Sequence, residues 1–284
     1  MDTDGLKAKV GDLEVRYRLY GRDNRAHPLV MIMGLGASLD VWEPVTLRLL
    51  ARDFRVLVFD NRDAGGTVGP PSPAPYTIRD MAEDTLRLMD HFGFGRAHVV
   101  GVSMGGMIAQ ELALAHPDRL GRLVLACTTP GFRSGVAPSD AVAQALSTAG
   151  RKDVPAWNAA LQLARVTLAP GWPVRHFWRL PGLWARTARW PVHPEAYARQ
   201  LAAIAEFEAG DRLTSLKVPT LVIHGDRDIL LPPDNARRLA DLIPGARLAI
   251  LKGAAHGLTT ERPVEFARMV RDFLLEPEAA ARRR

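Results

Sequence analysis

A serine between two glycines is the residue pattern here with the clearest chemical meaning. Ser103 lies in the pentapeptide Gly101-Val102-Ser103-Met104-Gly105, after an apolar run at 97–100 and before a helix-like stretch at 104–116. In a strand–turn–helix context, a G-x-S-x-G sequence forms a strained turn that exposes the serine hydroxyl as a nucleophile. An ordinary glycine-rich turn is the alternative. The pattern predicts that Ser103 is nucleophilic.

A serine hydroxyl is a poor nucleophile at neutral pH, so it needs a histidine base that an acid holds in one tautomer. In folds with this serine turn, the chain order is serine, acid, histidine. The strand-like run at 220–223 is followed by Asp226 and Asp228, and the run at 246–251 is followed by His256. His256 is therefore the candidate base, and either aspartate could be the acid.

Two backbone N–H groups must also face the negative charge that develops on the attacked carbonyl. One donor is expected from Met104, the residue after the nucleophile. The second is expected from the loop after the strand-like run at 29–32, where Gly34 and Gly36 let the backbone approach a substrate closely. A generic glycine-rich turn is again the alternative for this loop.

The elements that must position these groups alternate between strands and helices. Residues 13–19 alternate apolar and polar positions after a Gly11-Asp12 turn, which predicts a hairpin. Short apolar runs typical of strands buried on both faces follow at 29–32, 56–59, 97–100, 123–126 and 220–223. Helix-like stretches separate several of them, as at 77–92 and 104–116. This alternation predicts a doubly wound, mostly parallel α/β sheet.

The middle of the chain differs from both ends. Residues 131–212 contain no strand-like run, several prolines and five of the six tryptophans. We expect residues 1–130 and 213–284 to form the core, and residues 131–212 to form a helical insertion over the carboxyl edge of the sheet. Some of the tryptophans should hold this insertion together, and others should line a pocket.

Composition bounds the class of protein. The 284 residues are 47% hydrophobic and 24% charged, with a net charge of +6. The first residues lack the apolar core of a signal peptide, and no apolar stretch approaches the roughly 20 residues of a membrane span. We expect a cytoplasmic protein that binds no nucleic acid, since its arginines are scattered and the dense basic run at 282–284 closes a tail. The single cysteine, Cys127, permits no internal disulfide and no cysteine-based metal cluster.

Over nearly its whole length the sequence resembles the α/β-hydrolase superfamily, and most of all its esterase and lactonase branch. That branch includes β-ketoadipate enol-lactonases, aclacinomycin-type methylesterases and cofactor-free haloperoxidases. The matching stretches are 33–36, 60–65, 101–106, 224–232 and 253–256. The resemblance implies an eight-stranded sheet, a lid formed by the insertion, Asp228 as the acid with Asp226 as the fallback, and Leu35 as the second oxyanion donor. It also implies that no metal or organic cofactor is needed.

These observations predict a Ser-His-Asp hydrolase of a small-molecule carboxylic ester or lactone that works through an acyl-enzyme, as a monomer or homodimer without membrane partners. The alternatives are a hydrolase-fold ligand sensor or signalling partner with little turnover, or a C–C bond hydrolase. Arginines of the insertion could bind an acidic substrate, although most should face solvent. The residues expected to contact substrate are Gly34, Gly36, Trp157, Trp178, Trp184, Leu230 and Leu258.

Overall fold

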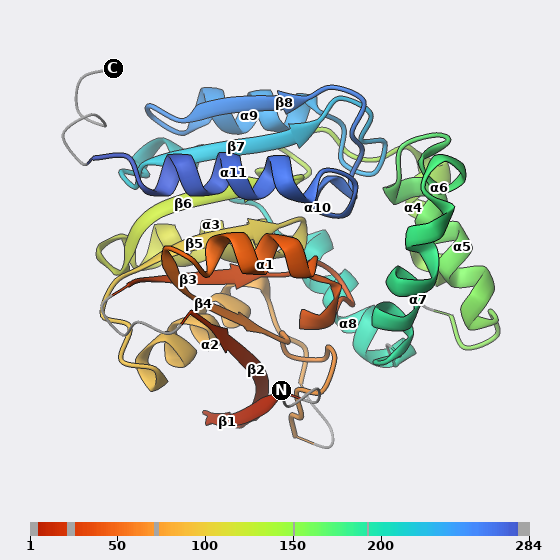
Figure 1. The fold of residues 1–284 in the computed structure, drawn as a ribbon, viewed down its shortest axis with the longest axis horizontal. Coiled ribbons are helices and arrows are strands. Elements are labelled where there is room, and N and C mark those ends of the chain that lie inside the picture. Colours follow the sequence, from red (N-terminus) through yellow and green to blue (C-terminus); the bar gives the residue numbers. More distant parts are fainter. Residues whose placement is uncertain (1–4, 22–25, 71–73, 150, 192, 278–284) are drawn as a thin grey trace.

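A computed structural model describes residues 5–21, 26–70, 74–149, 151–191 and 193–277, so the basic run at 282–284 lies outside the described residues. Its eight-stranded sheet has the order β1-β2-β4-β3-β5-β6-β7-β8 (Figure 1). The strands are β1 (Leu6–Val10), β2 (Leu13–Tyr20), β3 (His27–Ile32), β4 (Phe54–Phe59), β5 (Ala97–Val102), β6 (Leu120–Ala126), β7 (Thr220–Gly225) and β8 (Arg247–Leu251). Strand β2 pairs antiparallel with β1 and with β4, and the later pairs are parallel. The predicted fold class and the hairpin at Gly11-Asp12 are confirmed.

Helices cover both faces of this sheet because its central strands are mostly apolar and are buried on both faces. The core helices are α1 (Pro44–Leu50), α2 (Ile78–His91), α3 (Met104–Ala115), α9 (Asp234–Leu242), α10 (Leu258–Glu261) and α11 (Pro263–Leu274). Apolar residues of α2, α3 and α9 pack with Val30 and Ile32 on one face. Those of α1 and α11 pack with Leu29 and Met31 on the other. Short 3-10 helices complete the chain as η1 (Leu39–Val41), η2 (Pro117–Arg119), η3 (Phe177–Arg179) and η4 (Gly210–Ser215).

The strand order creates a crevice at the carboxyl ends of β3 and β5. The chain leaves β3 toward β4 on one side of the sheet, and β5 then adds to the other side of β3. In open parallel sheets, ligands bind where the order reverses in this way. The loop after β3 carries Gly34 and the turn after β5 carries Ser103. A Cβ on Gly34 would lie 3.0 Å from the Cβ of Ser103, so the two loops meet at this point.

Residues 131–212 form the helices α4 (Asp140–Ala149), α5 (Ala156–Thr167), α6 (Trp172–Arg175), α7 (Leu180–Ala188) and α8 (Pro194–Glu206). Figure 1 shows α4 to α7 standing beyond the carboxyl ends of the central strands. Within the described part of this range, β-structure is limited to one bridge that joins Gly131 to Glu208. We call residues 131–212 the helical segment.

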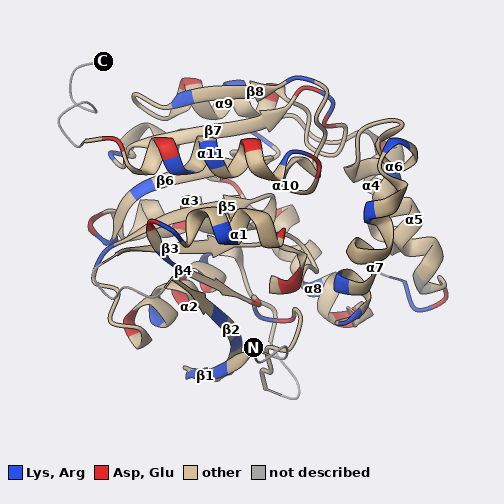
Figure 2. Cartoon of the chain, viewed as in Figure 1, with Lys and Arg blue, Asp and Glu red and all other residues tan. Residues whose placement is uncertain are grey.

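Charge is distributed unevenly between the core and the helical segment. Figure 2 shows acidic and basic positions interspersed over the core helices. Residues 154–193 contain five arginines and no acidic residue. Two of these arginines, Arg179 and Arg186, pair with Glu43 of the core. None of the described helices combines the length and the apolar character that crossing a bilayer requires.

Candidate active site

Ser103 occupies a strained turn between β5 and α3. Its φ of 57° and ψ of −121° are rare for a residue with a side chain, and such strain persists only where neighbouring structure imposes it. Gly101 and Gly105 make the turn possible. A Cβ on Gly101 would lie 2.2 Å from the carbonyl oxygen of Gly105, and a Cβ on Gly105 would lie 2.2 Å from that of Ile32. The two glycines therefore allow the turn to pack directly against itself and β3.

His256 and Asp228 lie in line with the serine hydroxyl. The Nε2 atom of His256 is 3.0 Å from the Oγ of Ser103, and its Nδ1 atom is 2.8 Å from the Oδ2 of Asp228. The three residues come from the turn after β5, the turn after β7 and the loop after β8. Asp226, the other candidate acid, is exposed and accepts a hydrogen bond from the N–H of Gly253 instead. The geometry favours Asp228 over Asp226.

The Asp228 carboxylate is buried and saturated with hydrogen bonds. Its Oδ1 accepts the backbone N–H groups of Leu230 and Leu231, each at 2.9 Å. Its Oδ2 lies beside the rings of His256 and His224. Burial by itself would raise the pKa of Asp228, but the two histidines hold that pKa well below its usual value. Asp228 is therefore an anion at neutral pH, as an orienting acid must be.

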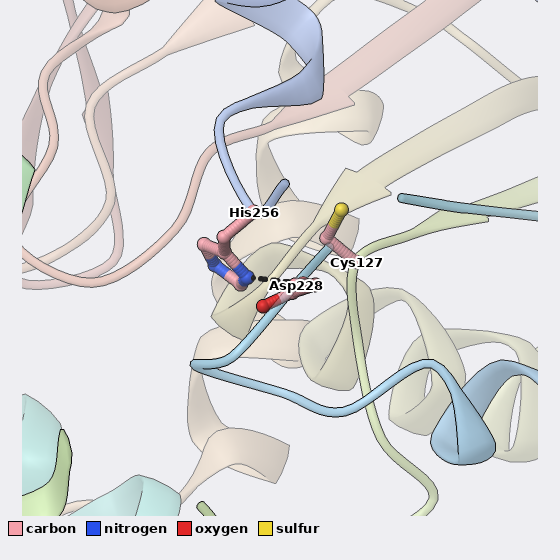
Figure 3. A group of neighbouring side chains, drawn as sticks. All are labelled: Cys127, Asp228 and His256. Carbon is pink, nitrogen blue, oxygen red and sulfur yellow. Dashed lines mark hydrogen bonds and ion pairs between the residues drawn. The ribbon is translucent and has the colours of Figure 1, made fainter. Parts of the chain in front are cut away.

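Cys127 lies next to this pair, and its sulfur forms a group with donor atoms of Asp228 and His256 that all lie within 4.8 Å of one another. Figure 3 shows the imidazole and the carboxylate facing each other, with the sulfur directed away from their hydrogen bond. Burial raises the pKa of the Cys127 thiol well above its usual value, whereas a metal ligand must be a thiolate. Both ring nitrogens of His256 are already in hydrogen bonds. The donor chemistry of this group does not fit a metal.

The two candidate oxyanion donors come from the turn of Ser103 and from the loop after β3 that meets it. Met104 is the first residue of α3, so its N–H has no carbonyl within the helix to accept it. Leu35 lies in the loop after β3, and both Leu35 and Ser103 line the same cavity. The N-terminus of α3 adds a partial positive charge at this place. The arrangement can stabilise an anion on a carbonyl oxygen bound next to Ser103.

Two side chains outside the predicted site hold the loop after β3. Asn61 donates its Nδ2–H to the carbonyl of Met33 at 2.9 Å, which gives a structural role to the segment 60–65. Gln200 of α8 is fully buried, accepts the N–H of Gly36 at 2.8 Å and donates to the carbonyl of Arg62 at 2.7 Å. Sequence reasoning missed Gln200 because no local pattern marks a residue whose partners lie more than a hundred positions away.

A buried carboxylate links the helical segment to the base. Glu261 of α10 accepts the backbone N–H of Ala169 at 2.7 Å and that of Ala255 at 3.0 Å. Burial raises the pKa of Glu261, although the two N–H groups and Arg262 oppose the effect. Ala255 precedes His256 in the chain. Glu261 therefore connects the loop of the base to the segment after α5, and nothing in the sequence near it had marked this role.

A cavity of about 1130 Å³ opens onto Ser103 and His256. Its wall is mainly apolar and comes from both the core and the helical segment. The expected contact residues Gly34, Leu230, Trp157 and Trp184 lie on this wall. Of the five arginines in residues 154–193, Arg165 lines the cavity.

Three expected contact residues lie elsewhere. Leu258 is fully buried in the core cluster with Phe266 and Val270, because it begins α10 and faces the sheet. Trp178 is 62% exposed in η3 and lies outside the set of cavity-lining residues. Gly36 is also outside that set, and its N–H is used by Gln200. Residue type alone did not distinguish the cavity wall from its surroundings.

The sequence is similar to a known protein family and to curated relatives. Residues 27–263 match the family model described as "alpha/beta hydrolase fold". A relative from Caulobacter sp. (strain K31), named "Putative carbamate hydrolase RutD", is 31% identical over an alignment of 262 residues that covers 87% of this chain and 90% of that one. A relative of the same name from Pseudomonas syringae pv. syringae (strain B728a) is 32% identical over 254 residues, covering 88% and 94% of the two chains.

A solved structure is similar over almost the whole fold. The enol-lactonase from Burkholderia xenovorans LB400 aligns with a TM-score of 0.82 and 31% sequence identity. The alignment covers 95% of this chain and 100% of that one. The similarity therefore includes the helical segment as well as the sheet.

Proposed function

This chain belongs to the α/β-hydrolase family, and on that premise we propose that it is a serine hydrolase that cleaves a carboxylic ester or a lactone. The observation that carries the proposal is the continuous hydrogen-bonded series from Ser103 through His256 to Asp228, with distances of 3.0 and 2.8 Å. The series ends at a cavity that can hold an organic substrate. We further propose that the helical segment is the lid of this cavity.

In the first half of the reaction, the Oγ of Ser103 attacks the carbonyl carbon while Nε2 of His256 accepts the hydroxyl proton. The N–H groups of Leu35 and Met104 bind the oxyanion that forms. Asp228 keeps the ring of His256 oriented and balances its positive charge. Collapse of the intermediate breaks the bond to the alcohol oxygen, which leaves with the proton from His256.

The second half repeats these steps with water. His256 takes a proton from a water molecule whose oxygen attacks the acyl carbon of the ester on Ser103. The same two N–H groups hold the second oxyanion. The bond to Oγ then breaks, Ser103 regains its proton from His256, and the carboxylic acid leaves. In a lactone, the alcohol and the acid belong to one molecule.

The cavity favours a neutral substrate with a medium-sized or large apolar group. Its volume is about 1130 Å³, and Trp157, Trp184 and Leu230 contribute to a mostly apolar wall. Arg179 and Arg186, which could have attracted an acidic substrate, are within 3.4 and 2.6 Å of Glu43. Glu43 therefore balances one of these two positive charges inside the protein. An apolar acyl or alcohol group gains free energy from leaving water in such a cavity.

Carbamate hydrolysis is the second candidate, because relatives about a third identical over most of the chain are named as carbamate hydrolases. A carbamate carbonyl can be attacked by the same serine and would give a carbamoyl-enzyme. The apolar cavity would then suit carbamates with apolar substituents. Matched pairs of aryl esters and aryl carbamates with the same apolar group would rank the two substrate classes.

The test begins with p-nitrophenyl esters of increasing acyl length and with fluorophosphonate labelling. We expect turnover that Ser103→Ala abolishes, and a label on Ser103 in the wild type. Ser147→Ala is the control, because this exposed hydroxyl on α4 bonds, within the part of the chain that the structure describes, only to the carbonyl of Ala143 in its own helix. Activity of Ser103→Ala at the wild-type rate would exclude Ser103 as the nucleophile. Wild-type turnover below about one per minute on every ester and carbamate, against an enzyme median near 10 s⁻¹, would favour a ligand sensor.

A further inference from the structure

A second histidine lies against the carboxylate of Asp228, and the reaction proposed above does not use it. His224 belongs to β7, and its side chain is fully buried. Its Nε2 atom is 3.1 Å from the Oδ2 of Asp228 and 2.8 Å from the carbonyl oxygen of Leu231. One ring nitrogen therefore contacts both the side chain of the acid and the backbone of the turn that carries it.

The contacts of His224 fix its tautomer. A backbone carbonyl only accepts hydrogen bonds, so the Nε2 atom facing Leu231 must carry a proton. The Nδ1 atom is buried and has no hydrogen-bond partner among the described residues. A second proton at Nδ1 would be a buried donor without an acceptor, which is costly. The ring is therefore neutral, with its one N–H donated to the carbonyl of Leu231 and the same nitrogen in contact with Asp228 Oδ2 at 3.1 Å.

Asp228 also bonds to the turn at 228–231 that His224 contacts. Asp228 Oδ1 accepts the N–H of Leu231, while the carbonyl of Leu231 accepts the Nε2–H of His224. This closes a ring of contacts through Asp228, Leu231 and His224. Rotation of the carboxylate away from His256 would break bonds on both of its oxygens.

We propose that His224 is a positioning residue for the catalytic acid, holding Asp228 Oδ2 and the turn at 228–231 in the orientation that His256 needs. The inference rests on the proposed function, since it assigns His224 a role in the same triad. The other titratable groups around this carboxylate are His256, Cys127 and, through a longer-range interaction, Glu261. Among these neighbours, His224 and His256 are the two side chains that share Oδ2.

Two substitutions separate positioning from simple filling of space. His224→Met replaces the ring with an apolar side chain that cannot donate a hydrogen bond, whereas His224→Gln places an amide N–H near the position of Nε2. We expect His224→Met to lower kcat about tenfold or more, with KM within about twofold, because the acid is no longer held in place. We expect His224→Gln to recover kcat to within about threefold of wild type. Circular dichroism and thermal unfolding would establish that both variants fold.

A wild-type kcat for folded His224→Met would overturn the proposal. So would an equally low kcat for a folded His224→Gln, since a donor at this place would then have no effect. Nitrogen NMR of histidine-labelled wild-type protein gives a test that needs no variant and no turnover. We expect the His224 resonances to show a protonated Nε2 and a bare Nδ1. A protonated Nδ1 on His224 would contradict the inference about His224. If the expected tautomer is found but no ester is hydrolysed, the result would contradict the proposed function instead.

Discussion

The backbone N–H of Gly36 donates to the side-chain Oε1 of Gln200 at 2.8 Å, across 164 positions of the chain. This bond joins α8 of the helical segment to the loop that carries Leu35. The amide of the same side chain donates to the carbonyl of Arg62 at 2.7 Å. One buried glutamine therefore fixes the place of a candidate oxyanion donor.

Replacing Gln200 with leucine should weaken the oxyanion site. Gln200→Leu leaves the N–H of Gly36 and the carbonyl of Arg62 without their partner in a partly buried place, so the loop should shift to satisfy them. We expect kcat for a p-nitrophenyl ester to fall about tenfold with little change in KM, as measured by steady-state kinetics. The neighbouring Arg199→Gln, which breaks an ion pair with Asp63, is the matched control and should stay within about twofold. Equal effects of the two substitutions would contradict this role.

Neutralising the two aspartates of the turn after β7 should have very different effects. Asp228→Asn removes the anion that orients His256, so we expect kcat to fall by about 10³–10⁴. Asp226→Asn changes an exposed side chain that accepts the N–H of Gly253, and we expect less than about a fivefold change. Steady-state kinetics on one ester, with thermal unfolding of both variants, measures the difference. The reverse ranking would move the acid to Asp226.

Glu261 should make the folded protein less stable as the pH rises. Burial raises the pKa of this carboxyl above its unfolded value, so the folded state binds its proton more strongly. The resulting stabilisation is complete below the unfolded pKa and is lost as the pH rises through the folded pKa. Glu261→Gln lacks this dependence but loses one acceptor, either for Ala169 or for Ala255. We expect the deficit in Tm of Glu261→Gln, measured by scanning calorimetry, to shrink as the pH increases through this window. A deficit independent of pH would show that Glu261 does not titrate there.

The arginines of the helical segment should contribute to stability more than to substrate choice. Replacing both Arg179 and Arg186 with glutamine removes the partners of Glu43, so we expect Tm to fall by a few degrees. The ratio of kcat/KM for a neutral ester to that for a matched ester with a terminal carboxylate should stay as in the wild type. The same ratio measured for Arg165→Gln is the comparison for the double variant, because the side chain of Arg165 lines the cavity and those of Arg179 and Arg186 pair with Glu43. A higher ratio in the double variant than in the wild type would assign Arg179 and Arg186 to binding of the acidic ester.

The parts of the site that the sequence predicted are those encoded by short local patterns. Gly101 and Gly105 mark the turn of Ser103 because only residues without a Cβ fit against the carbonyls of Gly105 and Ile32. The sheet could be predicted for the same reason, since its buried strands are continuous apolar runs. The residues alone did not decide whether Asp226 or Asp228 is the acid of the triad. The geometry separates them, because one is buried beside His256 and the other is exposed.

The supporting residues could not be predicted in this way. Gln200, His224 and Glu261 act through partners that only the folded chain brings near. A buried glutamine in a helix or a glutamate at the end of a short helix has no local signature of its contacts. The expected contact residues Trp178 and Leu258 show the converse, since an aromatic or apolar residue suits a surface, a core or a cavity wall equally well. Which of the three it occupies depends on how the helical segment packs.

The source of the cavity wall has a consequence for how this protein could change. Ser103, Asp228 and His256 all follow core strands, while much of the wall comes from α5 and α7. On the proposed function, the reacting groups and much of the substrate-binding wall therefore lie in separate stretches of the sequence. Exchanging α5 through α7 for the corresponding helices of another family member, with Ala169 and Gln200 retained as attachment points, should alter which molecules are accepted while the bond-breaking apparatus stays as it is.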